Sequence, residues 1–223
     1  MFLKGNLHRF VLSQGKGTMK QHLGVVPVAL LTLLVQSSLL AAEPSSQDRV
    51  VARGLFDEAR ALMTQNQVSQ ACPKFAESYR LDPKSGTLLN LAVCHEREGR
   101  IATAWMEYKD AITMSQKDSR PEREQMARER SAVVEPNLSK LTIVVLPQAD
   151  RPDLEIRLDD VVLGRGAWNA AIPVDPGEHK VRVTASGMEP MEGTITIGPT
   201  KDMQRLEVAP LRAKRAESAE SKR

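Results

Sequence analysis

The sequence repeats itself between residues 59–78, which read ARALMTQNQVSQACPKFAES, and residues 92–111, which read AVCHEREGRIATAWMEYKDA. Small residues, turn-forming residues and large apolar residues recur in the two stretches at one constant interval. The equivalent pairs are Ala59 and Ala92, Asn66 and Gly99, Ala71 and Ala104, Phe75 and Tyr108, and Ser78 and Ala111. A constant interval of this kind predicts two copies of one structural unit stacked on each other.

Each repeated position has a physical role in a helical hairpin. A small residue such as Ala59 lets two helices cross closely. Asn66 and Gly99 can adopt the left-handed conformation that ends a helix. Phe75 and Tyr108 can then fill the space between neighbouring hairpins.

The helical pattern extends on both sides of the repeat. It predicts helices at 47–65, 69–81, 87–98, 101–115 and 121–135. Ser85 and Thr87 are the expected N-caps of the third helix. Pro73 lacks a backbone N–H, so the second helix should begin nearer Gln70 or bend at the proline. The last helix is expected to close the stack with a polar outer face.

These features resemble the tetratricopeptide repeat (TPR) family, whose period is about 34 residues. Leu55 and Leu62 stand where that family usually has Trp and Tyr. The resemblance implies a short α-solenoid in which the first helix of each hairpin lines a groove for a protein or peptide partner. The residues expected along this groove are Arg53, Phe56, Arg60, Met63, Leu89, Asn90, Val93 and Arg97.

Cys72 and Cys94 are the two cysteines of the chain. They fall on the second and third predicted helices, which are neighbours in a stack of hairpins. In an oxidising compartment such a pair is a disulfide candidate, whereas two buried thiols would act as small apolar residues. The disulfide is the favoured interpretation, and no Cys-x-x-Cys motif suggests a redox role.

Residues 139–211 change to a period of two. Leu154, Ile156 and Leu158 alternate with charged residues, and the same pattern recurs around residues 180–185. The stretch 141–146, LTIVVL, is more continuously apolar and predicts a strand that is buried on both faces. Turn residues separate these segments, so they predict a small antiparallel β-sandwich.

This half is similar to the PEGA domain, a compact β-sandwich of bacterial envelope proteins. The similarity rests on Asp175-Pro-Gly177, on the alternating strand that follows it, and on Gly187. Asp160 stands where that family commonly has a turn glycine. The overall fold class expected is therefore α+β in two separate domains: a TPR-like α-solenoid followed by a PEGA-like sandwich.

The amino-terminal region has the pattern of a secretory signal. Residues 23–40 are mostly apolar, Lys20 precedes them, and Ala41-Ala42 follows. The signal predicts export to the periplasm or cell envelope of a Gram-negative bacterium, with Met19 as the expected true start. An uncleaved membrane anchor is the alternative, because the apolar run approaches the length that spans a bilayer.

The predicted organisation has five parts. They are a leader at 1–42, a spacer at 43–51, helical repeats with a closing helix at 52–135, the sandwich at 139–211, and a disordered tail at 212–223.

Composition argues against several classes of function. The net charge is +3 and the aromatic fraction is 4%, so neither the basic stripe nor the stacking surface of a nucleic-acid binder is expected. No nucleophile-and-base pattern or phosphate loop is recognisable, which predicts a non-enzymatic protein without a cofactor. His95 has no second histidine one turn away, so it is expected at the surface or as a cap, and no metal site is expected.

The leading hypothesis is a periplasmic interaction or scaffold protein. In this hypothesis, the helices bind a protein partner and the sandwich docks to the envelope. The alternative is a structural protein associated with carbohydrate or peptidoglycan, in which the sandwich binds and the helices serve as a stalk. In that case Trp168 could act as a sugar platform, although a core or edge anchor is the more usual role of such a residue. A hydrolase without recognisable motifs is the third and weakest hypothesis.

Overall fold

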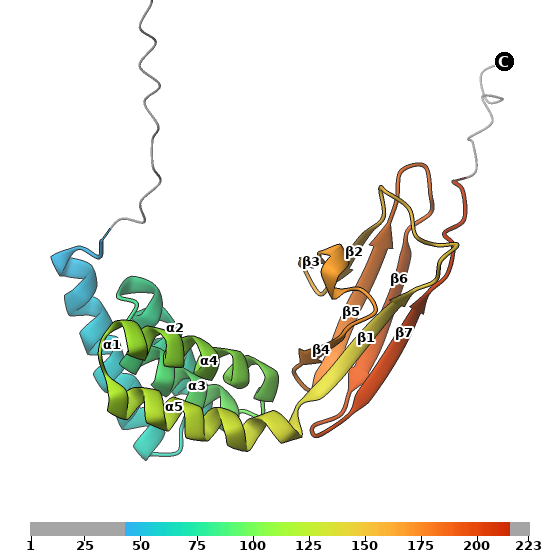
Figure 1. Cartoon of the computed structure of the whole chain (residues 1–223). Coiled ribbons are helices and arrows are strands. Elements are labelled where there is room, and N and C mark those ends of the chain that lie inside the picture. Colours follow the sequence, from blue (N-terminus) through green and yellow to red (C-terminus); the bar gives the residue numbers. More distant parts are fainter. Residues whose placement is uncertain (1–42, 215–223) are drawn as a thin grey trace, which may run out of the picture. The chain divides into compact units, whose positions relative to one another are not determined.

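The computed structural model describes residues 43–214 and has an α+β fold (Figure 1). The predicted leader, with Met19 and its signal, lies outside the described residues. The helices are α1 (Ser46–Thr64), α2 (Val68–Leu81), α3 (Ser85–Arg97), α4 (Ile101–Lys117) and α5 (Pro121–Val134), followed by the short 3₁₀ helix η1 (Glu135–Asn137). Within the described range, no helix combines the length and hydropathy needed to cross a membrane.

Consecutive helices pack as pairs, α1 with α2 and α3 with α4, and α5 packs on α4. The chain reverses within each of the two pairs at a residue with left-handed backbone. These residues are Asn66, with φ of 60°, and Gly99, with φ of 80°. The prediction that equivalent positions of the repeat end their helices in this way is confirmed.

The repeated positions form the helical core. Ala59, Ala71, Ala92 and Ala104 are each 0% exposed, which brings the backbones of the paired helices close together. The large positions are buried as well, and the centroid of the Phe75 ring lies 5.6 Å from that of Phe56 in an edge-to-face contact.

Tyr108 is also fully buried, and its hydroxyl donates a 2.6 Å hydrogen bond to the Glu96 carboxylate. Burial, together with this hydrogen bond, raises the pKa of Tyr108 well above its usual range. The phenol is therefore neutral and hydrogen-bonded at ordinary pH. Tyr108 thus makes a polar contact that Phe75, at the equivalent position of the first repeat, cannot make.

Helix ends differ from the sequence prediction in three places. Helix α1 begins at Ser46, inside the predicted spacer, because Ser45 and Asp48 form a reciprocal capping box. The N-cap of α3 is Lys84, so Ser85 and Thr87 were wrongly predicted as caps; both lie buried in the first turn. Pro73 is accommodated within α2, which begins upstream at Val68 rather than near Gln70.

The strands form two sheets. They are β1 (Ser139–Val145), β2 (Glu155–Leu158), β3 (Val161–Leu163), β4 (Ala171–Val174), β5 (Gly177–Thr184), β6 (Met191–Ile197) and β7 (Met203–Val208), with η2 (Arg165–Ala167) between β3 and β4. The strand orders are β4-β1-β7 and β3-β2-β5-β6. Residues from both sheets make one apolar core, in which Leu141, Ile156, Val183 and Val208 are 0% exposed.

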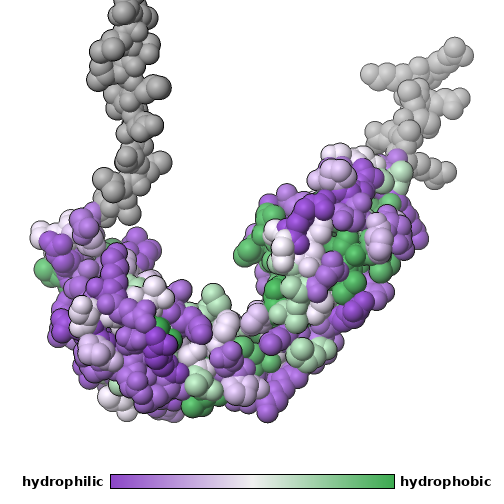
Figure 2. Space-filling view, viewed as in Figure 1, coloured by the Kyte–Doolittle hydropathy of each residue, from purple (hydrophilic) through white to green (hydrophobic). Residues whose placement is uncertain are grey.

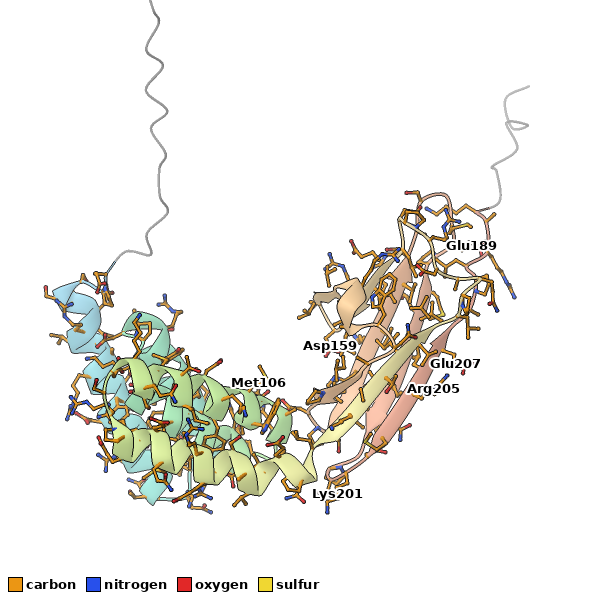
Figure 3. All side chains as sticks on the ribbon, in the orientation of Figure 1. Met106, Asp159, Glu189, Lys201, Arg205 and Glu207 are labelled. Atoms are coloured by element: carbon orange, nitrogen blue, oxygen red, sulfur yellow. A yellow bond between two sulfur atoms is a disulfide. The ribbon has the colours of Figure 1, made fainter. Side chains whose placement is uncertain are left out.

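The expectation of a purely antiparallel arrangement is wrong, because β1 and β7 are parallel. The turn before β7 is tied to the start of β1: Ser139 donates a 2.8 Å hydrogen bond to the carbonyl of Gly198, and the Lys201 amide donates to the carbonyl of Asn137. Strand β7 must therefore begin beside the beginning of β1, as the position of Lys201 shows (Figure 3).

Strand β1 is also not buried on both faces as predicted. Leu141, Ile143 and Val145 are buried, whereas Thr142 and Val144 between them are half-buried. One face of the sheet meets the other sheet and the opposite face remains accessible to solvent. A continuous apolar run is compatible with either arrangement, since β-branched residues favour strands on both faces.

The predicted tail begins too early. A β-bridge pairs Ala213 with Met188, and the Lys214 amide donates a 2.9 Å hydrogen bond to the carbonyl of Gly187. Residues 212–214 are thus bonded to the turn between β5 and β6. The rest of the predicted tail lies outside the described residues.

Candidate functional site

A cleft of about 160 Å³ opens between the amino-terminal end of α3 and the surrounding helices. Helix α1 contributes an aromatic ring and a guanidinium, the turn between α2 and α3 contributes charged residues, and α5 contributes a second guanidinium. The lining residues are Ala52, Arg53, Phe56, Ser78, Asp82, Lys84, Gly86, Thr87 and Arg123.

Most charges of the cleft are already paired. The Arg53 guanidinium lies 2.8 Å from the carboxylate of Asp57, and the Lys84 ammonium lies 2.5 Å from that of Asp82. Arg123 differs, because within the described part of the chain its guanidinium donates only to the Ser85 hydroxyl, at 3.4 Å. Among residues 43–214, no carboxylate lies within 4.0 Å of it.

The position of Arg123 depends on Gly86. A Cβ added at Gly86 would lie 3.2 Å from the central carbon of the Arg123 guanidinium. The absence of a side chain there lets the guanidinium lie directly over the first turn of α3. The half-buried Arg123 is therefore held at the cleft wall with hydrogen-bonding capacity to spare, since a guanidinium carries five N–H donors.

The predicted groove residues do not form one continuous surface. Arg53 and Phe56 line the cleft, and the guanidinium of Arg60 lies 6.0 Å from the centroid of the Phe56 ring. Met63 and Val93 are half-buried against the helical core.

The remaining groove predictions fall on α3. Leu89 is 5% exposed and belongs to the core, so it cannot contact a partner. The Asn90 amide donates to the carbonyl of Gly86 at 2.8 Å, and Arg97 donates to the carbonyl of Met63 at 3.4 Å. Leu89 is lost to the core because α3 packs against α2, α4 and α5, whereas Asn90 is half-buried and Arg97 is exposed.

Sequence reasoning missed Lys84 and Gly86, and it did not single out Arg123 within the charged run of the last helix. The turn-forming stretch Asp82-Pro-Lys84 before α3 gave a signal for a loop, but no pattern connects it with α5, more than thirty residues later. Only the packing of α5 beside the start of α3 brings Arg123 to this place.

Cys72 on α2 and Cys94 on α3 lie at disulfide distance, with their sulfurs 2.16 Å and their Cα atoms 5.5 Å apart. The pairing favoured from the sequence is therefore present in the structure. It links the first helical pair to the second.

His95 is buried, not at the surface or at a helix cap as expected. It is 7% exposed, and its Nδ1 lies 2.8 and 3.0 Å from the two carboxylate oxygens of Glu107 on α4. A carboxylate can only accept, so Nδ1 carries the proton and donates. This pair fixes the orientation of the imidazole ring inside the helical half.

Trp168 in the strand half is a core residue. It is 8% exposed, its indole N–H donates to the carbonyl of Leu163 at 3.2 Å, and the Arg165 guanidinium covers its ring at 4.6 Å. The expectation of an anchor is confirmed, and the ring offers no free face on which a sugar could stack.

Asp175, in the turn between β4 and β5, caps the amino-terminal end of α4. Its carboxylate accepts from the Thr103 amide at 2.9 Å and from the Thr103 hydroxyl at 2.5 Å, with the Arg100 guanidinium 3.5 Å away. Helix α4 has no side-chain cap from its own N-cap residue. A carboxylate from the β4–β5 turn thus satisfies one amide in the first turn of α4 that would otherwise lack a partner.

His179 holds this turn from the strand side. Its Nε2 lies 2.7 Å from the carbonyl of Asp175, and its Nδ1 lies 2.9 Å from the carboxylate of Asp159, at the β2–β3 turn (Figure 3). Burial lowers the pKa of His179, but the hydrogen bonds to Asp159 and Asp175 outweigh it, and the net pKa is raised.

We expect the strand half to lose stability as the pH rises through the pKa of His179. Because the pKa of His179 is higher in the folded protein than in the unfolded chain, protonated His179 stabilises the fold. This stabilisation is complete below the pKa of the unfolded chain, near 6.5, and is lost as the pH rises above the pKa of the folded protein. Asp159 is half exposed, so the effect should stay below about 1 kcal/mol. Urea unfolding at pH 5.5 and 8.5 measures it, and His179→Gln should abolish that pH-dependent difference. An unchanged difference in the variant would contradict the assignment.

The chain matches no protein-family model and no curated protein.

Proposed function

We propose that this protein is a non-enzymatic interaction module whose helical cleft binds an acidic segment of another polypeptide. The observation that carries the proposal is Arg123, a cation fixed at the cleft wall without a carboxylate partner among residues 43–214. A guanidinium in this state favours a ligand carboxylate, with which it can form two parallel hydrogen bonds. Phe56 adds an apolar surface beside it.

The size of the cleft limits the ligand. At about 160 Å³, it has room for one acidic side chain or a chain-terminal carboxylate with little else. A single anchored residue gives modest affinity, because most binding energy in such interfaces comes from a few well-packed groups. The visible face of the helices is largely hydrophilic (Figure 2), which favours a reversible partner over a permanent, apolar subunit interface.

The architecture proposed for this function is a short TPR-like stack followed by a PEGA-like sandwich. Support for the stack comes from equal burial at equivalent positions, such as Ala59 with Ala92 and Phe75 with Tyr108. Support for the sandwich comes from the single core shared by the two sheets. The proposed compartment is the periplasm or envelope, where a disulfide such as Cys72–Cys94 persists.

The alternative, binding of envelope polysaccharide or peptidoglycan by the strand half, has less support. The aromatic residue that could have stacked on a sugar, Trp168, is buried beneath Arg165. We therefore retain the helical cleft as the binding site. Export itself is tested by sequencing the amino terminus of the protein recovered from fractionated cells, which should begin near residue 43.

The binding proposal is tested with labelled peptides that differ only in carrying Glu or Gln at one position. Fluorescence anisotropy should show the Glu peptide binding more tightly, and Arg123→Ala should weaken it about tenfold, the loss expected for about 1.4 kcal/mol. Arg128→Ala is the matched control, because Arg128 lies on the same helix but is paired with Glu124 at 2.7 Å. Equal binding of the two peptides, or equal losses in the two variants, would refute the proposal.

A further inference from the structure

A second cluster of reactive side chains lies in the helical half and shares no residue with the cleft. The ligand-capable atoms of Cys72, His95 and Glu98 all lie within 4.8 Å of one another. Cys72 and His95 are buried, whereas Glu98, at the end of α3, is exposed. The cluster thus has two buried members and one member that is accessible to solvent.

His95 can offer a nitrogen lone pair at Nε2. When its Nδ1–H donates to Glu107, Nε2 is left as the acceptor atom of the ring. A carboxylate behind an imidazole is the usual arrangement around a metal-binding histidine, because it fixes the tautomer and makes the free nitrogen more basic.

The disulfide determines whether Cys72 is available as a ligand. In the oxidised chain the Cys72 sulfur is bonded to Cys94 and cannot act as a thiolate, which is the form that binds metal. The Cys94 sulfur lies 3.5 Å from the sulfur of Met63 and is not among the three clustered ligands.

We propose that reduction of the Cys72–Cys94 disulfide opens a site for a zinc-class divalent cation formed by Cys72, His95 and Glu98. A dithiol reductant supplies two electrons and two protons, so two Cys thiols form and the dithiol becomes a disulfide. The cation then displaces the proton of the Cys72 thiol. Thiolate, imidazole and carboxylate are ligands of zinc rather than of calcium or magnesium.

The geometry requires only small adjustments. Zinc-bound atoms in a tetrahedral site lie roughly 3.4–3.8 Å apart, given metal–ligand distances of about 2.0–2.3 Å. The exposed carboxylate of Glu98 can move toward the buried pair by rotating its side chain. Three protein ligands leave a fourth position for water, on the solvent side. This site departs from the expectation, based on sequence, that no metal would bind.

Two serine variants distinguish the ligand from its disulfide partner. Both Cys94→Ser and Cys72→Ser abolish the disulfide, but only Cys94→Ser leaves the Cys72 thiol in place. Each protein is freed of metal with a chelator and then titrated with Co²⁺, a spectroscopic substitute for Zn²⁺. We expect Cys94→Ser to bind one equivalent with a thiolate-to-cobalt charge-transfer band, and at least tenfold more tightly than Cys72→Ser.

The wild-type chain provides the redox control. It should show no charge-transfer band while oxidised, and should gain the band after treatment with dithiothreitol that is removed before titration. Glu98→Gln in the Cys94→Ser background should weaken binding without disturbing the fold, because Glu98 is exposed. Equal binding by the two serine variants, no binding by either, or an equal band in the oxidised protein would overturn the proposal.

Discussion

Replacing Phe75 with alanine is expected to lower the free energy of unfolding by about 3–5 kcal/mol. Phe75 is 1% exposed and contacts Phe56 edge to face, so the substitution removes buried apolar surface and leaves a cavity in the helical core. The surrounding helices can close this cavity only partly, since one disulfide and several alanine contacts hold them at fixed spacing. Chemical denaturation followed by far-ultraviolet circular dichroism measures the change.

The control for this prediction is Met106→Ala on α4. Met106 is 51% exposed and projects away from the helical core (Figure 3). Surface truncations of this kind usually change stability by less than about 0.5 kcal/mol. A similar loss in both variants would mean that the burial of Phe75 contributes no more to stability than an exposed side chain does.

Loss of the Cys72–Cys94 disulfide should lower the free energy of unfolding by about 3 kcal/mol, because it closes a loop with a sequence separation of 22 residues. Cys72→Ser, Cys94→Ser and the double variant should lose nearly the same amount, since all three break one cross-link. Denaturation in the presence of a chelator measures the loss without any contribution from bound metal.

Reduction of the wild-type chain provides an independent comparison for the disulfide. Treatment with a dithiol in chelator should reproduce the destabilisation of the serine variants, while the helical circular dichroism signal at low denaturant stays unchanged. A reduced protein as stable as the oxidised one would show that the cross-link contributes nothing. Losses in the two single variants that add in the double variant would show that the serines act through packing instead.

The sequence predicted the helical half well because its signals are local and repeated. Five helices were expected close to their observed bounds, and the left-handed residues Asn66 and Gly99 were identified from their side chains alone. The disulfide partners were also identified, because the chain has only two cysteines. The prediction that β1 is buried on both faces was wrong, since an apolar run does not record how many layers cover a strand.

The candidate sites were harder to predict, and the reason is distance along the chain. Arg123 reaches the cleft only because α5 packs beside the start of α3, and Leu89 is removed from the predicted groove because three helices surround α3. The same holds for His95. The absence of a second histidine one turn away indicated a surface or cap role, whereas His95 is buried and Glu107 on α4 orients it.

The sequence by itself determined where the five helices and some of the strands lie, because the period of apolar residues and the turn residues between them act over a few residues. Only the tertiary structure decided which distant parts of the chain meet. Arg123 meets the first turn of α3, His95 meets Glu107, and β7 pairs with β1 in parallel. These contacts depend on packing free energies summed over whole elements. No short stretch of sequence contains that information.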